Sequence, residues 1–259
     1  MSNSHKKKLL TAGCGISQSS FRHWPTWVKY PEMTHELSHI NIGGPASGNE
    51  YIAQNIIKNL RDVDCAIIVW TGYQKMDFHI ESQNVVDEIK TYPTRNFVLD
   101  DKGQVIDRAP AWWPSSTSGE NRIKDWVLEN IYSDTQQLDQ TLISIAGVQR
   151  ALERHGIDYH MFLGYKIPLD NAEAYGIDLT KFVTLEVMYD NYLDSHWKSQ
   201  YSTIKNNAMI PVAGWHWQFY KDHIYKIIDE NFKSKNAKLD KIELAVQAIT
   251  QKNYEQGIS

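Results

Sequence analysis

Apolar runs alternate with amphipathic stretches along the first 70 residues of the chain. Residues 8–13 and 65–70 are almost continuously apolar or small, which is typical of strands buried on both faces of a parallel sheet. A shorter strand is expected at 39–42, and the stretch at 52–60 carries its apolar residues at helical spacing. This order of strand, helix, strand, helix and strand predicts a parallel sheet covered by helices on both faces.

Proline and capping residues place the helices between these strands. The segment Trp24–Trp27 predicts a short helix with Pro25 in its first turn, where a missing N–H group costs nothing, and Pro31 limits that helix. A second helix is expected after a capping box of Ser47 and Glu50, which satisfies free N–H groups at a helix start. These two helices would connect the first three strands.

The same alternation returns in the second half of the chain. A capping box of Ser133 and Gln136 begins a long helix that runs to about Arg154, before Gly156 ends it. The other expected elements are strands at 159–163 and 182–188 and helices at 216–231 and 238–253. Together these elements predict an α/β protein with a mainly parallel, five-stranded sheet.

The middle of the chain departs from this pattern. Residues 96–106 predict a small hairpin around an Asp-Lys-Gly turn, and 108–120 read as a turn-rich loop that carries Trp112 and Trp113. We interpret both segments as an insertion over one end of the sheet. The expected organisation is one domain over 1–259, with the insertion at about 92–120 and a C-terminal helical extension at about 232–259.

Composition and charge narrow the class of protein. The 259 residues are 42% hydrophobic and 22% charged, which is ordinary for a soluble globular domain. A net charge of -4 gives no basic footprint for a nucleic-acid partner. No stretch approaches the length of a membrane span, and the basic start is too short for a secretory signal. We therefore expect a cytoplasmic protein, or a virion protein if the source is a phage.

The two cysteines and one histidine motif bear on disulfides and metals. Cys14 and Cys65 both lie in or beside apolar strands, so no disulfide is expected, and their spacing does not indicate zinc. His35, Glu36 and His39 match H-E-x-x-H, which binds zinc only when it lies on a helix. The proline just before the motif and the strand at its end argue against that helix. We expect neither a metal nor a cofactor.

Glycine-rich turns follow each of the first three strands. The segment Lys8–Ser17 is an apolar run that breaks into Gly13 and Gly15, so that Cys14 or Ser17 would be exposed at the carboxyl end of a central strand. A Gly-Gly turn follows the second strand, and Trp-Thr-Gly ends the third. Because carboxyl ends of parallel strands share one edge, these turns predict a site there.

The order of these three turns resembles that of the SGNH/GDSL hydrolases. Gly13-Cys14-Gly15 is similar to the Gly-Cys-Ser variant of their first motif, and a frame two residues later supplies Ser17 as nucleophile. The resemblance implies a flavodoxin-like α/β/α sandwich and a serine activated by a late histidine. The residue roles it implies are catalytic for Ser17, His216 and Asp194, oxyanion-binding for Gly44 and Thr71, and substrate-binding for Asn49, Trp112 and Trp113.

Three positions differ from the family pattern. Gly15 occupies the usual serine position, Thr71 or Gln74 would have to replace an asparagine donor, and Ala213 stands where an aspartate precedes the histidine. Other candidates for the base and for its acidic partner are His196, His223 and Asp222. Each departure removes a group that the catalytic arrangement uses.

Two functions remain open from the sequence. The first is a serine hydrolase that cleaves an ester, such as an O-acyl group on a carbohydrate. The second is a catalytically inactive SGNH-like binding or structural module, for example of a phage particle. The expected partner is a small-molecule or carbohydrate ester, with no nucleic acid and no membrane, and the sequence leaves the oligomeric state open.

Overall fold

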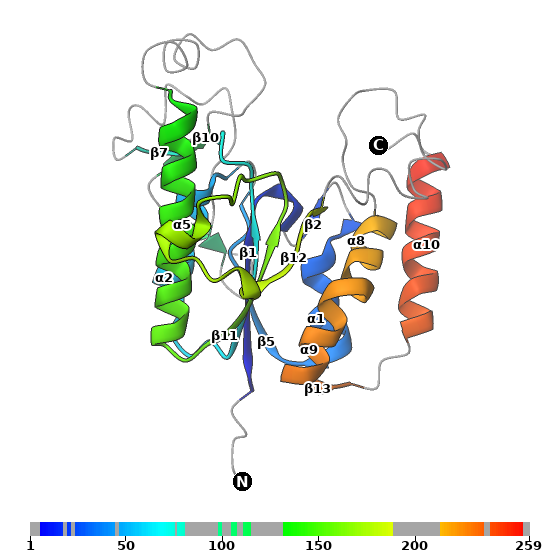
Figure 1. The fold of residues 1–259 in the computed structure, drawn as a ribbon. Coiled ribbons are helices and arrows are strands. Elements are labelled where there is room, and N and C mark those ends of the chain that lie inside the picture. The colour runs from blue at the N-terminus through cyan, green and yellow to red at the C-terminus, as the bar shows by residue number, and fades with distance from the viewer. Residues whose placement is uncertain are drawn as a thin grey trace.

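A five-stranded parallel sheet with helices on both faces forms the centre of the computed structural model (Figure 1). The residues described are 6–17, 20–21, 24–44, 47–75, 77–80, 98–99, 105–107, 111–114, 132–188, 213–235 and 239–255. The sheet strands are β1 (Lys8–Gly13), β5 (Ser38–Asn41), β6 (Cys65–Trp70), β11 (Asp158–Leu163) and β12 (Phe182–Val187). Their spatial order is β12-β11-β6-β1-β5, all neighbours parallel, so the fold is the expected flavodoxin-like three-layer sandwich.

One face of the sheet is covered by α2 (Asn49–Lys58) and α5 (Asp134–Arg154) (Figure 1). Ile52 and Ile56 of α2 and Ile145 of α5 are fully buried there. Each such side chain contributes about 1.5–3 kcal/mol by leaving water. The apolar spacing predicted at 52–60 is therefore the face that holds this layer to the sheet, except at Ile57, whose side chain is exposed.

The other face is covered by α1 (Tyr30–Thr34), α8 (Ala213–Phe219) and α9 (Tyr225–Asn231), and α10 (Leu239–Glu255) packs on the outer side of α8 (Figure 1). Its core is aromatic: the Trp27 ring meets Phe219 edge-on at 5.9 Å, and Trp215 stacks on Phe219 at 5.7 Å. Much of the chain's aromatic content is thus used to fill this layer.

Alternate residues of β6 divide between the two faces, as a strand period of two requires. Ala66, Ile68 and Trp70 pack on the α2 side, whereas Cys65, Ile67 and Val69 pack on the α8 side. All six are buried. This confirms the prediction of a strand buried on both faces.

Several helix ends differ from the sequence predictions. Trp24–Pro25 is a short strand (β3), the 3-10 turn η2 covers Trp27–Lys29, and Pro31 lies in the first turn of α1 instead of ending a helix. Proline fits there because the first N–H groups of a helix have no partner inside it. The late helix is interrupted by the π-helical turn η5 (Tyr220–Ile224), which apolar spacing alone did not indicate.

Short antiparallel pairs surround the main sheet. β8 (Val98–Leu99) pairs with β9 (Val105–Asp107), and β10 (Ala111–Pro114) pairs with β7 (Asp77–Ile80). The Asp-Lys-Gly turn lies outside the described residues, as do the side chains of Trp112 and Trp113. β4 (His35–Glu36) pairs with β13 (Lys233–Ser234), and β2 (Ser20–Phe21) pairs with β3.

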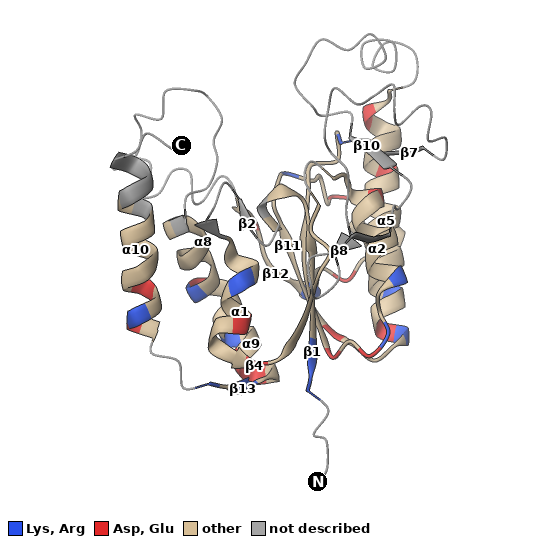
Figure 2. Ribbon diagram, turned by 180° about the vertical axis from the view of Figure 1, so that it is seen from behind, with Lys and Arg blue, Asp and Glu red and all other residues tan. Residues whose placement is uncertain are grey.

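The five strands of the main sheet carry few charged residues (Figure 2): Lys8 begins β1, Asp158 begins β11 and Glu186 lies in β12. Among the described helices, none is both long and apolar enough to cross a bilayer. Cys14 and Cys65 are both buried and are free cysteines in this structure.

Candidate functional site

The turn after β1 holds the candidate nucleophile at the carboxyl edge of the sheet. Gly13 ends the strand with φ +155°, and the 3-10 turn η1 (Gly15–Ser17) closes with a 2.8 Å bond from the Ser17 amide to the Cys14 carbonyl. A Cβ atom on Gly13 would collide with the Ser17 hydroxyl and lie 2.9 Å from the Val69 carbonyl. Glycine is required here because the turn packs directly on it.

The Gly43-Gly44 turn packs against η1 and is fixed from two strands. The Asn41 Oδ1 atom of β5 accepts a 3.0 Å bond from the Gly43 amide and a 3.1 Å bond from the Thr11 hydroxyl of β1. The Gly44 amide donates to the Gly13 carbonyl at 3.0 Å. The Gly44 N–H group is therefore already used, and the prediction that it points at an oxyanion is wrong for this structure.

Ser17 and His216 do not form the expected pair. The Ser17 hydroxyl is fully buried and has no hydrogen-bond partner, and the His216 Nδ1 atom is also buried without one. The serine thus stands at the predicted strand end, but its hydroxyl is buried and is not hydrogen-bonded to a base. A general base accepts its proton across a hydrogen bond of about 2.6–3.2 Å between heavy atoms, or through one water, and the Ser17 hydroxyl makes no hydrogen bond to a base.

Burial also weakens His216 as a base. Its side chain lies in α8 beside Trp215, with ring centroids 4.7 Å apart, and burial lowers the pKa of its imidazole to about 3. The ring is therefore neutral at pH 7, but its affinity for a proton is far below that of a base matched to neutral pH. Asp222, an alternative orienting acid, accepts a 2.7 Å bond from Gln218 on its own helix.

Thr71 and Asn49 form a clamp instead of a substrate contact. Asn49 Oδ1 accepts a 2.9 Å bond from the Thr71 amide, and Asn49 Nδ2 donates to the Thr71 carbonyl at 2.9 Å and to the Thr141 hydroxyl at 3.2 Å. All three bonds are buried, so the Asn49 amide is not available to a substrate, contrary to the sequence prediction. The Thr71 hydroxyl is buried without a partner.

The start of α2 is capped by a carboxylate from outside the predicted capping box. Ser47 donates to the Gly44 carbonyl at 2.7 Å, and Gly48 is the N-cap residue. Asp77 of β7 accepts from the Gly48 amide at 2.8 Å and from the Tyr51 amide at 2.9 Å. Burial raises the Asp77 pKa to about 6 despite these two bonds.

Some predicted site residues lie outside the described part of the chain. These are Asp194 and His196, together with the side chains of Trp112, Trp113 and Ala213. Their contribution to the site stays a prediction. His223 is described and packs against the Phe162 and Phe219 rings, where burial lowers the pKa of its imidazole.

The H-E-x-x-H residues are split between two polar networks. His35 of β4 lies 3.2 Å from Asp229 Oδ1 and 2.8 Å from the Thr34 hydroxyl. His39 of β5 instead lies 2.7 Å from the Thr11 hydroxyl and 3.3 Å from Glu32. The motif is therefore not helical, as its flanking proline and strand predicted.

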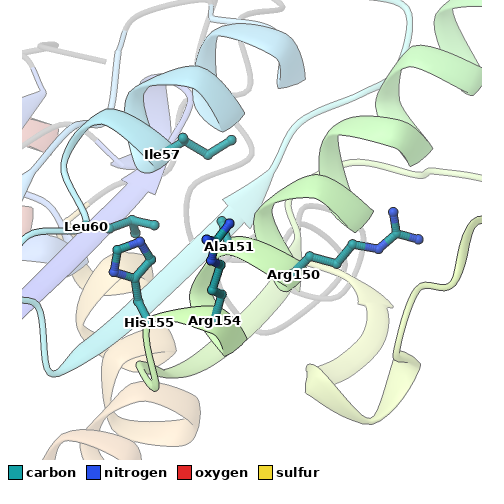
Figure 3. A pocket seen from close by; sticks show the side chains of 6 residues that line it. All are labelled: Ile57, Leu60, Arg150, Ala151, Arg154 and His155. Atoms are coloured by element: carbon teal, nitrogen blue, oxygen red, sulfur yellow. The ribbon is translucent and has the colours of Figure 1, made fainter.

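A separate hollow lies between the C-terminal ends of α2 and α5 (Figure 3). It is lined by Ile57, Leu60, Arg150, Ala151, Arg154 and His155. Arg150 donates to the Tyr175 carbonyl at 3.2 Å. The hollow contains none of the residues that the family resemblance assigns.

Comparisons of the chain with protein-family models, curated proteins and solved structures find no match. The SGNH/GDSL resemblance therefore rests on the turn motifs and their order along the chain.

Proposed function

We propose that this chain is a non-catalytic binding module built on an SGNH-like fold. The observation that carries the proposal is the state of Ser17, whose hydroxyl is fully buried and bonded to no base. A nucleophile must reach its substrate and transfer its proton as it attacks. The Gly43-Gly44 turn also favours a non-catalytic module, because the Gly44 amide donates to the Gly13 carbonyl and is not free to bind an oxyanion.

The binding surface in this proposal is the carboxyl edge of the sheet, near the ends of β1 and β6. The strand order reverses there: the chain passes from β1 to β5 on one side and returns to β6 on the other. Ligands of doubly wound sheets bind at such a switch point. The ligand class that the family resemblance implies is an O-acylated carbohydrate, bound without cleavage.

Reactivity and binding can be measured on the same protein. Wild type and Ser17→Ala are incubated with a fluorophosphonate probe and with a short p-nitrophenyl ester, beside an active serine hydrolase as positive control. We expect no labelling and no hydrolysis above buffer for either variant. Calorimetry with an O-acetylated polysaccharide and its de-acetylated form then tests binding, and we expect the acetylated form to bind more tightly.

A serine hydrolase is the second candidate. It is favoured by Ser17 and Thr71, two buried hydroxyls without partners at the ends of neighbouring strands, since a catalytic role is one explanation for a buried polar group that lacks a partner. Labelling of the wild type that disappears in Ser17→Ala would establish this candidate and refute the binding module. Labelling that disappears only in Cys14→Ala would make the thiol the nucleophile.

A further inference from the structure

Three potential metal ligands meet at the amino edge of the sheet, away from the turns that end its strands. Cys65 begins β6 and Asp158 begins β11, and the two residues are paired in the parallel register. His160 lies two residues after Asp158 and therefore on the same face of β11. The register thus brings a thiol, a carboxylate and an imidazole to one place.

The ligand atoms are close enough for one ion. The Cys65 sulfur, an Asp158 carboxylate oxygen and a His160 ring nitrogen all lie within 4.8 Å of one another. Asp158 Oδ2 and His160 Nε2 are 3.3 Å apart. Zinc bonds of about 2.0–2.3 Å in a tetrahedron place ligand atoms roughly 3.3–3.7 Å apart. The histidine and the carboxylate have that spacing already, and the 4.8 Å limit means that the sulfur needs a shift of at most about 1 Å.

Access and charge also suit a cation. Cys65 is fully buried, whereas the side chains of His160 and Asp158 are 26% and 48% exposed, so the cluster opens to solvent on one side. The carboxylates of Asp158 and Asp64 act electrostatically on the Cys65 sulfur and favour a positive ion beside it, whereas the ammonium group of Lys7 acts in the opposite direction. Asn231 donates to Asp158 Oδ2 at 3.2 Å and steadies that carboxylate.

We propose that Cys65, Asp158 and His160 form a binding site for a divalent ion of the zinc class. Sulfur, nitrogen and oxygen donors together are typical of zinc, and three protein ligands leave the fourth position open to water or to a further ligand. The site is independent of the proposed binding of a carbohydrate, because it lies at the opposite edge of the sheet.

Cobalt reports on the sulfur ligand directly. The full chain is stripped with a chelator, checked for folding by circular dichroism, and titrated with Co²⁺. Wild type should develop the near-ultraviolet thiolate-to-cobalt absorption band together with visible bands of tetrahedral cobalt. Zinc should remove these bands by displacement. Cys65→Ser should abolish the thiolate band, and Cys14→Ser, which changes the other buried cysteine, should keep it.

Two partly exposed ligands keep the test informative if Cys65→Ser fails to fold. His160→Gln and Asp158→Asn should each weaken cobalt binding at least tenfold while leaving the circular dichroism spectrum unchanged. His155→Gln, at an exposed histidine outside the cluster, should bind like wild type. Absence of a thiolate band in the wild type, or its loss in Cys14→Ser with retention in Cys65→Ser, would overturn the proposal. Unchanged binding in both His160→Gln and Asp158→Asn would do the same.

Discussion

The raised pKa of Asp77 allows a quantitative prediction. This residue caps α2 with a carboxyl group whose charged form is destabilised by burial. Its two oxygens accept the Gly48 and Tyr51 amides, and its pKa is nevertheless raised from 3.8 to about 6. The folded protein therefore binds this proton more tightly than the unfolded chain does. The resulting stability is fully present below pH 3.8 and is lost as the pH rises through about 6.

The rise in the Asp77 pKa from 3.8 to about 6 corresponds to a pH-dependent change of about 3 kcal/mol in the free energy of unfolding, at 1.36 kcal/mol for each pKa unit. About 2 kcal/mol of this falls between about pH 4.5 and about pH 7.5. Unfolding free energies of wild type and Asp77→Asn, measured by urea titration at both pH values, isolate that part. On going to the lower pH, wild type should gain about 2 kcal/mol relative to the variant.

Comparing wild type with Asp77→Asn cancels the effects that the other titratable groups have on the free energy of unfolding. Protonation of His216 acts in the opposite direction, because its folded pKa is lowered from 6.5 to about 3, so its stability contribution is lost as the pH falls below 6.5. That effect is common to wild type and Asp77→Asn and cancels in the difference. A difference that does not change with pH, or that favours wild type at the higher pH, would refute the reasoning on Asp77.

Three further predictions concern Gly48 at the start of α2, the Asn49 clamp and His216. Gly48→Ala should destabilise the protein, because its Cβ would lie 2.6 Å from Asp77 Oδ2, whereas Gly147→Ala, with no atom within 4 Å, should stabilise it by about 0.5–1 kcal/mol. Asn49→Ala should cost about 3 kcal/mol, since it leaves the buried Thr71 amide and carbonyl unpaired. The His216 ring, followed by NMR, should stay neutral down to about pH 4.

Each of these predictions has a control or a contrary result. Asn55→Ala removes one bond to the Tyr51 carbonyl on the same helix and should cost less than about 1 kcal/mol. Equal losses in Asn49→Ala and Asn55→Ala would contradict the clamp. A His216 ring that titrates near its ordinary value of 6.5 would mean that it is reached by water. Equal stability of Gly48→Ala and Gly147→Ala would contradict the close approach of Asp77.

The sheet could be predicted because its strands are local apolar runs. Residues 65–70 were expected as a buried strand and form β6 with the same bounds, and Ser133 caps α5 as its capping box indicated. The start of α2 was not predictable in the same way. Its cap comes from Asp77, which stands 29 residues beyond Gly48, and no local pattern reveals a tertiary contact of that kind.

The candidate site was predictable in position but not in geometry. The glycines after β1 and β5 correctly marked closely packed turns at the carboxyl edge. Whether the Ser17 hydroxyl faces outward depends on how those two turns pack together, which the order of residues does not specify. The ligand cluster of Cys65 and Asp158 was missed because it depends on the register of two strands far apart in sequence.

The central claim is that Ser17 is not a working nucleophile. Fluorophosphonate labelling of native wild type, followed by intact-mass spectrometry, tests it most directly. The buried, unpaired hydroxyl predicts an unmodified mass after prolonged incubation, the same as for Ser17→Ala. One added phosphonyl group on wild type, mapped to Ser17 and absent from Ser17→Ala, would contradict the account.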